Sequence, residues 1–492
     1  MEVALNLDPI SPIALYRQIY DGLRDGIVGG RFEAGTKLPA SRALATSLGV
    51  SRITVTECYE RLISEGYLET RRGSGTFVCS SLPETDMYAS SVPLAIDPEP
   101  ESPMPVRLSI YGELINAPIR PPIPPELIRL DSHGPDVNSF PRKLWTRLLV
   151  RRMQEDPSPL LQYTQEFSGS TDLRIAVAHY LRMSRAVVCD PNQIIITSGS
   201  QQALYFAARI FLDPSDCVAM ESPGYRFAGR IFSSQGATLL PIPVDSHGMQ
   251  VSQLKKHSDK AVKLVYVTPS HQYPRGVALS VPRRMDLLAW AKQTGALILE
   301  DDYDSEYRYN ERPLPSIQGM VPNAPVLYIG TFSKLLFPTL RLGYLVVPPA
   351  FQDVFTGAKL LCDLQSSSID QRILTDFLTE GHLEPYVRKM RINYRNRRAV
   401  LVESLQRHFG RRVTIYGDHA GMHFLADFQI DLAEPEAFER ALAAGVRLER
   451  VYWPACSEVE RPGHVQFVFT FAARSEGELV LAAEKLARAF LS

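Results

Sequence analysis

The 492-residue sequence predicts a multidomain α/β protein in which a small helical domain precedes a large α/β domain. Three observations lead to this prediction. Apolar residues at helical spacing, separated by turn glycines, occupy roughly the first eighty positions. Prolines then crowd a stretch where they block helices and central strands. Beyond Ile128, helical and strand-like segments alternate to the C-terminus, as they do around a mostly parallel sheet.

Composition limits the class of protein. The formal net charge is -1 and 45% of the residues are hydrophobic, which is typical of a globular chain with two or more cores. The six cysteines include no C-x-x-C pair, so we expect a reducing compartment with the thiols buried as small apolar groups. No basic cluster precedes an apolar run near Met1, and no apolar run is long enough to span a bilayer. We therefore expect a cytoplasmic protein with no membrane partner.

The N-terminal segment has the pattern of three helices and a hairpin. Helical spacing predicts a first helix that ends at the glycine pair 29–30, a second over 41–48, and a third that Ser51 caps and that runs to about Glu65. Two strand-like stretches, 66–70 and 76–78, flank a basic turn at 71–75. Helix, helix, turn, helix and wing is a DNA-binding layout. Hydroxyls and an arginine at the start of the third helix suit phosphates and base edges.

This segment resembles the winged helix-turn-helix of the GntR family. The match is carried by Leu38-Pro39-Ala40-Ser41-Arg42, Leu48-Gly49-Val50-Ser51-Arg52, Thr54-Val55, Leu62, Glu65-Gly66-Tyr67-Leu68 and Arg72-Gly73-Ser74-Gly75-Thr76-Phe77-Val78. The resemblance implies that double-stranded promoter DNA is bound by Arg42, Ser51, Arg52, Thr54, Thr56, Arg72 and Gly73. The alternative is a module that serves only protein–protein interaction, which the arginines on both helix and wing disfavour.

A proline-rich connector follows the hairpin. Prolines recur from Pro93 to Pro125 among serines and acidic residues, which predicts an extended, semi-rigid spacer. Residues 107–114 could form a short ordered piece against the large domain. We expect a DNA-binding domain over 1–80, a linker over 81–125 and a large domain over 126–492.

Several predicted strands of the large domain end in residues suited to a ligand. The stretch 193–197 runs into Ser198-Gly199-Ser200-Gln201, a strand, glycine turn and helix start that can bind an anion, although many such turns bind nothing. Tyr225 follows the strand 217–221, and a turn-rich loop at 268–276 follows the next strand. Open α/β sheets bind ligands at this edge.

A cluster of acids follows the strand at 296–300, beginning with Asp301-Asp302-Tyr303-Asp304. Uncompensated, these carboxylates would repel one another. A pyridinium nitrogen is one compensation, because a neighbouring carboxylate keeps it protonated. A metal ion is the other, but no histidine lies near enough in the sequence to favour it, so we expect no metal site.

Lys334 ends the stretch Gly330-Thr331-Phe332-Ser333-Lys334 and precedes Leu335-Leu336-Phe337. A lysine in such apolar surroundings is desolvated, which favours the neutral amine that forms a Schiff base with an aldehyde. Arg341 follows, with a guanidinium suited to a phosphate. The pair indicates pyridoxal phosphate. The alternative is a loop lysine that reaches solvent and an arginine paired with a carboxylate.

From about Ile128 to the C-terminus the chain resembles the fold-type-I aminotransferases, which bind pyridoxal 5'-phosphate. By that resemblance Lys334 forms the internal aldimine, Asp301 pairs with the ring nitrogen, Tyr303 bonds the ring hydroxyl oxygen and Tyr225 stacks on the ring. The phosphate is held by Ser200, Gln201, Ser333 and Arg341. Tyr163 resembles the tyrosine that this class extends to the partner subunit's phosphate, which implies a homodimer through this domain.

Two positions depart from the family pattern. Tyr273-Pro274-Arg275-Gly276 stands where many of these enzymes have a loop ending Asn-Pro-x-Gly, whose asparagine lies against the ring hydroxyl. Val468 stands where they place an arginine for the substrate α-carboxylate. A valine cannot hold a carboxylate, so transamination of ordinary amino acids loses a positioning contact. In addition, Arg388, Arg391, Arg395 and Arg398 form a stripe at helical spacing, which indicates a solvated or ion-paired face or, less often, a contact with DNA or the connector.

The whole arrangement resembles the MocR subfamily of bacterial GntR-type transcription regulators. The resemblance implies a dimer that binds promoter DNA and senses a small amine, an amino acid or pyridoxal phosphate itself through Lys334, with transaminase activity that is weak or absent. One alternative is a true aminotransferase with an accessory DNA-binding domain. Another is a large domain that serves as a dimerisation scaffold without cofactor. The effector, the operator and the direction of regulation do not follow from the sequence.

Overall fold

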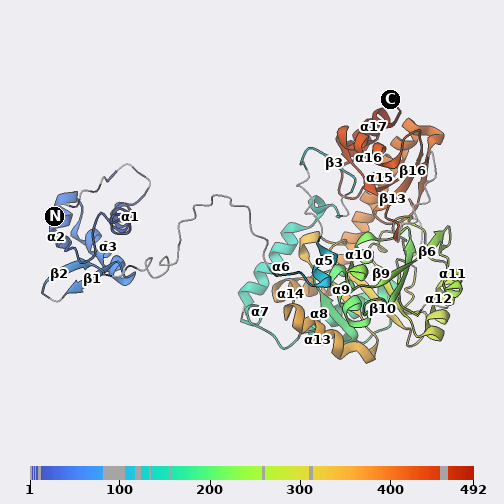
Figure 1. Ribbon diagram of the computed structural model, residues 1–492, viewed down its shortest axis with the longest axis horizontal. Helices are drawn as coiled ribbons and strands as arrows, with labels where there is room; N and C mark the ends of the chain where they lie inside the picture. Colours follow the sequence, from blue (N-terminus) through green and yellow to red (C-terminus); the bar gives the residue numbers. More distant parts are fainter. Residues whose placement is uncertain are drawn as a thin grey trace. The chain divides into compact units, whose positions relative to one another are not determined.

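The computed structural model describes residues 3, 5, 7, 8, 11, 13–71, 73–80, 82, 106–116, 124–131, 134–155, 158–257, 261–309, 314–454 and 464–491. The chain divides into two compact units, Met1–Arg107 and Leu108–Ser492, and Figure 1 colours the helices and strands of the first unit blue. Over the described residues, no helix has both the length and the apolar character that crossing a membrane requires.

The first unit contains the predicted three helices and hairpin. They are α1 (Leu15–Val28), α2 (Ser41–Leu48), α3 (Arg52–Ser64), β1 (Leu68–Arg71) and β2 (Gly75–Val78). The predicted cap is confirmed, because the Ser51 hydroxyl accepts a hydrogen bond of 3.2 Å from the Thr54 amide. The apolar faces of the helices meet in one core around Leu23, Leu44 and Leu62.

An eight-stranded sheet in the order β4-β11-β10-β9-β8-β5-β6-β7 forms the centre of the second unit. Neighbours from β10 to β6 are parallel, whereas β11 is antiparallel to both β10 and β4. Strands β4, β5, β8, β9 and β10 therefore end at one edge, and β11 begins there. The strands are β4 (Ile194–Thr197), β5 (Cys217–Ser222), β6 (Thr238–Asp245), β7 (Gly248–Met249), β8 (Val262–Val267), β9 (Leu297–Asp302), β10 (Val326–Thr331) and β11 (Gly343–Val346).

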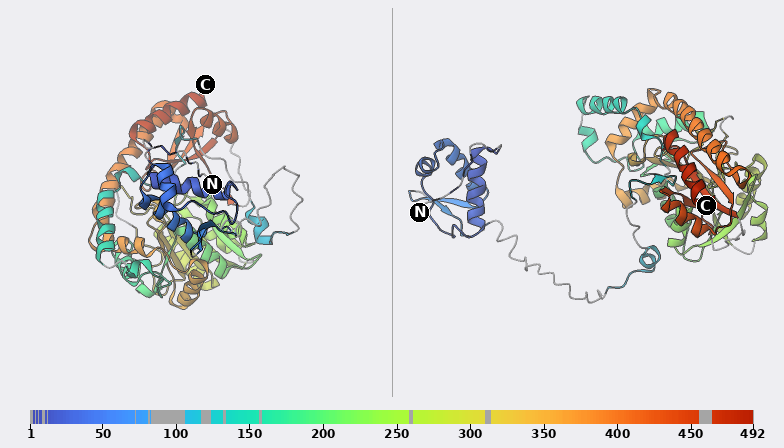
Figure 2. Two further views of the ribbon diagram at one scale, coloured as in Figure 1. Left: turned by 90° about the vertical axis from the view of Figure 1, so that its left-hand side faces the viewer. Right: turned by 90° about the horizontal axis from the view of Figure 1, so that it is seen from above.

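Helices cover both faces of this sheet. Leu299 of β9 packs in a core with α9 (Ser200–Phe211), α10 (Arg226–Ser234) and α13 (Gln352–Asp363). Its neighbour Ile298 points to the opposite face and packs with α12 (Val281–Thr294), and α8 (Thr171–Arg185) packs on β4 and β11. The helix α14 (Ser368–Thr379) contacts α6 (Arg142–Glu155), and these orange and teal helices lie together in both views of Figure 2.

A second, four-stranded antiparallel sheet lies in the C-terminal part, with strands in the order β12-β13-β16-β15. Its strands are β12 (Val413–Tyr416), β13 (His423–Gln429), β15 (Glu449–Arg450) and β16 (His464–Thr470), and its helices are α15 (Leu383–Phe409), α16 (Glu434–Ala443) and α17 (Glu476–Leu491). Strand β14 (Val446–Arg447) pairs with β3 (Ile128–Arg129), so the start of the large domain joins its end.

Two smaller expectations have definite outcomes. The ordered piece near residues 107–114 is the helix α5 (Ile110–Ile115), which contacts α10. Cys58, Cys189 and Cys217 are buried as expected, but the expectation is wrong for Cys362, which is exposed because it lies in the last turn of α13. Most of the predicted linker, and Cys456, lie outside the described residues.

Candidate functional site

The residues that the sequence singled out in the large domain meet at one edge of the central sheet. Lys334 and Ser333 follow β10, Tyr225 follows β5, and Asp301 and Tyr303 lie at the end of β9. Ser200 and Gln201 begin α9 directly after β4. Arg341 reaches the same edge because it precedes β11, the strand of opposite direction. Parallel strands thus gather side chains that are far apart in the chain.

Lys334 has the electrostatic character that its sequence context predicts. Burial lowers the pKa of Lys334 to about 8, and the negative charges of Asp304, Glu449 and Asp301 limit the fall. A substantial fraction of this amine is therefore neutral near physiological pH, whereas an exposed lysine is almost entirely protonated. A neutral amine at a sheet edge is the nucleophile that a carbonyl group requires.

Asp301 has one carboxylate oxygen that is hydrogen-bonded and one that has no partner in the described part of the chain. Its Oδ2 accepts a hydrogen bond of 2.8 Å from the Tyr266 hydroxyl, while the buried Oδ1 has no hydrogen-bond partner among the described residues. Burial raises the pKa of Asp301 to about 7. An unpaired buried carboxylate oxygen is costly unless a ligand completes it.

The neighbouring acids are engaged within the protein. Asp302 points to the other face of β9 and pairs with Arg185 at 2.6 Å, and both side chains are 1% exposed. Glu300 accepts hydrogen bonds from the backbone amides of Ile317 and Gln318. Asp302 Oδ1 also lacks a hydrogen-bond partner among the described residues, but Asp302 has the Arg185 guanidinium beside it. Asp301 lies on the same face of β9 as Leu299, which packs with α9 and α10.

A tight backbone approach creates an anion-binding geometry at the start of α9. Gly199 has φ +94°, and a Cβ at this position would lie only 3.2 Å from the Arg341 guanidinium. That guanidinium donates a hydrogen bond to the Ser198 carbonyl oxygen. The Ser333 hydroxyl is buried and has no hydrogen-bond partner in the described part of the chain. Free amides of a helix start, a guanidinium and an open hydroxyl together suit a phosphate.

Three tyrosines, Tyr225, Tyr273 and Tyr303, lie at the same edge of the sheet as Asp301 and the start of α9. The Tyr225 hydroxyl accepts a hydrogen bond of 2.9 Å from the Gln201 amide, so these two predicted residues contact each other. Tyr303 donates to the carbonyl oxygen of His271 at 2.8 Å. The ring of Tyr273 stands edge-on to that of Tyr225, with centroids 5.6 Å apart.

Val468 lies in this region, as its alignment with the carboxylate-binding position of the family implies. It is fully buried and clusters with Tyr273 and Leu425, against Tyr225 and Tyr303. The strand next to it places Glu449 directly opposite Val468. Val468 therefore places an apolar side chain, with a carboxylate on the next strand, where the family has an arginine.

The sequence analysis missed a buried His–Asp–His cluster beside the site. Asp304 contacts His271 Nδ1 at 3.1 Å, and His423 of β13 lies 4.0 Å from the same carboxylate. The candidate ligand atoms of these three residues all lie within 4.8 Å of one another. Neither histidine is a neighbour of Asp304 along the chain, so sequence distance alone does not reveal the cluster. The loop containing His271 ends at the same sheet edge as Asp304, which was the available signal.

Tyr163 stands apart from these contacts. It follows the short helix α7 (Ser158–Leu161), and its side chain is 85% exposed. Arg341 is also exposed in the single chain. An exposed tyrosine and an exposed phosphate-type arginine are the features that a partner subunit would cover.

The predicted DNA-binding residues lie at the surface of the first unit. Arg42 and Arg52 are exposed, and Gly73 has φ +77° in the turn of the hairpin. The Thr56 hydroxyl donates to the Arg52 carbonyl oxygen at 2.9 Å, so that hydroxyl is engaged in α3. Arg72 lies outside the described residues.

Sequence reasoning overlooked Ile53, which is 71% exposed next to Arg52 at the start of α3. An apolar side chain at this position suits the methyl group of thymine. The signal was its place in the first turn of the third helix, off the buried stripe that Val55 and Tyr59 define.

The arginine stripe of α15 is largely engaged inside the large unit. Arg388 pairs with Glu384 at 3.0 Å, Arg391 donates to the Glu306 carbonyl oxygen at 2.8 Å, and Arg398 donates to the Asp418 carbonyl oxygen at 2.6 Å. These contacts support the interpretation of a paired and solvated face.

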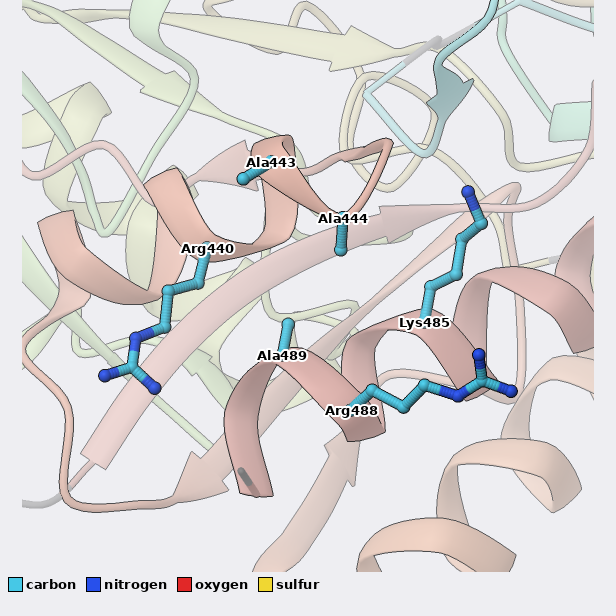
Figure 3. A pocket seen from close by; sticks show the side chains of 6 residues that line it. All are labelled: Arg440, Ala443, Ala444, Lys485, Arg488 and Ala489. Atoms are coloured by element: carbon cyan, nitrogen blue, oxygen red, sulfur yellow. The ribbon is translucent and has the colours of Figure 1, made fainter.

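A groove between α16 and α17 lies on the C-terminal part and contains none of the residues above. Figure 3 shows Ala443, Ala444 and Ala489 between the two helices, with longer basic side chains around them. Arg440 of this groove pairs with Glu436 at 2.8 Å. Exposed cations of this kind are common on protein surfaces and indicate no ligand by themselves.

Comparisons with known proteins agree with this geometry. Residues 15–78 match the family described as bacterial regulatory proteins of the gntR family, and residues 142–486 match aminotransferase class I and II. The chain is 38% identical to a probable rhizopine catabolism regulatory protein MocR of Rhizobium meliloti, over 90% of this chain and 87% of that one. It is 32% identical to the pyridoxine biosynthesis regulator PdxR of Corynebacterium glutamicum, over 82% of each chain. Among solved structures, a kynurenine aminotransferase of Pyrococcus horikoshii matches with a TM-score of 0.68 and 28% identity, over 78% of this chain and 95% of that one.

Fold, site and comparisons together define a DNA-binding transcription regulator whose large domain is an aminotransferase-type domain that binds pyridoxal phosphate. The chain belongs to the MocR subfamily of GntR-type transcription regulators.

Proposed function

We propose that this regulator senses a small amine, an amino acid or the cofactor itself at Lys334, and that the response reaches DNA through the first unit. One observation carries the proposal above the others. The amine of Lys334, with its lowered pKa, shares a sheet edge with two buried oxygens that lack hydrogen-bond partners among the described residues, Asp301 Oδ1 and Ser333 Oγ. These are the partners that a pyridinium nitrogen and a phosphate require.

Each residue has a distinct role in this proposal. Asp301 holds a proton on the ring nitrogen, Tyr225 packs on the ring, and Tyr303 faces the ring hydroxyl. Ser200, Gln201, Ser333 and Arg341 hold the phosphate at the start of α9. The tight Gly199–Arg341 approach supports the last assignment, because it directs the guanidinium toward the free amides of the helix. Tyr163 of the partner subunit completes the phosphate site in a homodimer.

Pyridoxal phosphate, if held by these residues, would supply an aldehyde for which the neutral amine of Lys334 and the amine of an effector would compete by exchange. The exchange consumes no oxidant. Release of Lys334 would change the charge and position of a side chain on which the charges of acids from both sheets act. For this to regulate DNA binding, the effector must bind two states of the dimer unequally.

DNA binding in this proposal depends on the N-terminal end of α3 and on the hairpin. Arg42 and Arg52 are exposed and available to phosphates or base edges. Ser51 and Thr54 fix the first turn of α3 through their cap, so their role is to orient as well as to contact. Gly73 permits the tight hairpin turn, and Arg72, its neighbour in the sequence, is the proposed contact with the minor groove.

The Lys334→Ala variant tests the proposal. It should lose the yellow absorbance of bound cofactor and the borohydride-trapped adduct, lose the response to effector, and keep its affinity for an operator selected from random duplexes. Lys263→Ala is the control, because Lys263 lies near the start of β8, at the opposite end of that strand from the site, and pairs with Asp216 at 2.6 Å. An effector response that persists in Lys334→Ala would contradict the proposal. Sustained keto-acid production by the native protein would instead favour a true aminotransferase.

A further inference from the structure

A row of three side chains on the C-terminal sheet lies beside the pocket of Lys334. In the antiparallel register Leu425 of β13 is opposite Val468 of β16, and Val468 is opposite Glu449 of β15. Residues directly opposite on antiparallel strands point to the same face. Leu425 and Val468 cluster with Tyr273, against Tyr225 and Tyr303. The Leu425–Val468–Glu449 row therefore combines two apolar side chains and one acid at the place where an effector would lie.

Glu449 acts on the pocket electrostatically. Its negative charge favours the protonated form of Lys334, and its carboxylate accepts a hydrogen bond from the Tyr273 hydroxyl. The other charges that act on Lys334 belong to Asp301 and Asp304. Asp301 is assigned to the ring nitrogen of the cofactor, which leaves Glu449 and Asp304 as the carboxylates near the amine. Their negative potential attracts a second cationic group and repels an anionic one.

The position that would neutralise an effector carboxylate is apolar. Val468 is fully buried and cannot donate a hydrogen bond. Arg226 is a guanidinium whose charge acts on Tyr225 and Tyr273, and it lies over the ring of Phe227 at 5.1 Å. An effector with a carboxylate would have to recruit Arg226 against the field of Glu449.

We propose that the effector is an aliphatic diamine without a carboxylate. One amine takes the place of the Lys334 nitrogen, the methylene chain lies against the apolar cluster that Tyr273 forms with Leu425 and Val468, and the second ammonium is bound by Glu449. This inference rests on the proposed function of Lys334 and adds the chemical class of the ligand. In this proposal Leu425, Val468 and Glu449 determine which group the effector carries at the end away from Lys334.

Three amines with four-carbon chains test the proposal with the cofactor-loaded full chain. Putrescine, butylamine and gamma-aminobutyrate present an ammonium, a methyl group and a carboxylate at the far end. Binding is followed by the absorbance of the bound cofactor and by titration calorimetry. We expect putrescine to bind about tenfold or more tightly than butylamine, from one charge-assisted hydrogen bond, and gamma-aminobutyrate to bind most weakly.

Two variants separate the contributions. Glu449→Gln should raise the dissociation constant for putrescine about tenfold relative to that for butylamine, because the lost charge near Lys334 affects both amines and only putrescine loses the partner of its second ammonium. Glu434→Gln is the matched control, since Glu434 begins α16 and is paired with Arg450, which lies on the same strand as Glu449. Val468→Arg should strengthen gamma-aminobutyrate relative to putrescine. The butylamine titration shows whether a variant still folds and carries the cofactor.

Failure of this inference differs from failure of the proposed function. A colourless native protein without a trapped adduct on Lys334 would overturn both. A coloured protein that binds putrescine no more tightly than butylamine, or that responds to none of the three amines, would overturn the diamine assignment alone. An unchanged preference in Glu449→Gln would have the same meaning.

Discussion

At the scale of single residues, burial changes the pKa of two central residues of the candidate site, Lys334 and Asp301. It lowers the pKa of Lys334 to about 8 and raises the pKa of Asp301 to about 7. The two shifts have opposite signs because burial disfavours the charged form of each group. A bound cofactor would offer an aldehyde to Lys334 and a pyridinium to Asp301. It would thereby offset the free energy that burial of each charged group costs.

The lowered pKa of Lys334 predicts the pH dependence of cofactor capture. Below pH about 8 the rate at which cofactor-free protein binds pyridoxal phosphate should rise about tenfold per pH unit, because only the neutral amine reacts, and above that pH it should level off. Stopped-flow absorbance measures the rate. A rate that continues to rise to the ordinary lysine range near pH 10 would contradict the prediction.

The raised pKa of Asp301 predicts the stability of the cofactor-free protein. Because its folded pKa is about 7 and its ordinary value 3.8, its contribution is most favourable below pH about 4 and is lost as pH rises through 7. Asp301→Asn should therefore make the cofactor-free protein more stable at pH 8, by on the order of 2–4 kcal/mol, and bind the cofactor more weakly. Urea unfolding at pH 4 and pH 8 measures the effect.

Asp302→Asn is the control for that prediction. Asp302 is paired with Arg185, and both are buried, so its loss should destabilise the protein by roughly 3–5 kcal/mol. If Asp301→Asn also destabilised the cofactor-free protein at pH 8, Asp301 would be a structural ion-pair partner like its neighbour.

At the scale of elements, the direction of a strand decides which side chains can meet. Arg341 reaches the edge that carries Lys334 because β11 reverses direction between β10 and β4. In the first unit the start of α3 is fixed by the Ser51 cap and exposes Arg52 and Ile53. The start of a helix is positive through its dipole, so it favours phosphate contacts.

The α3 assignment predicts a change in DNA binding that is independent of sequence. Arg52→Ala should weaken binding to a mixed-sequence duplex and reduce the slope of log affinity against log salt by about 1, because one phosphate contact is lost. Fluorescence anisotropy over a salt series measures both quantities. Arg24→Ala is the control, since Arg24 lies on α1 and pairs with Asp25 at 2.9 Å. Equal slopes for the two variants would remove Arg52 from the interface.

At the scale of the whole molecule, the proposed homodimer joins two incomplete sites. Tyr163 is 85% exposed in the single chain, and Arg341 is exposed at the proposed phosphate end. If each subunit placed its Tyr163 in the phosphate site of the other, both Tyr163 and Arg341 would be covered. Such an exchange would also make cofactor binding depend on assembly, which links sensing to the spacing of two DNA-binding units.

Mixed dimers test this exchange. Tyr163→Ala dimers should bind cofactor weakly, and Lys334→Ala dimers should form no covalent adduct. When the two variants are refolded together, tight covalent binding should reappear, because in a mixed dimer the intact Lys334 of one chain meets the intact Tyr163 of the other. Borohydride trapping followed by mass spectrometry measures the adduct at low cofactor concentration. No recovery would place Tyr163 in its own chain's site or outside both.

The sequence by itself determined the local features, because helix caps, apolar spacing and short motifs are properties of neighbouring residues. It gave α2 over Ser41–Leu48, the Ser51 cap, the strand before Lys334 and the desolvation of that lysine. These features depend on a few positions along the chain. Assignment of roles to Ser200, Asp301 and Arg341 needed the family resemblance as well.

Only the tertiary structure decided how distant segments meet. It separated Asp301, on the face of β9 that packs with α9, from Asp302, which pairs with Arg185. It also brought His423 to Asp304 across more than a hundred residues and set Glu449 opposite Val468. The physical reason is that strand order and register fix which side chains share a face, and both follow from packing over the whole domain.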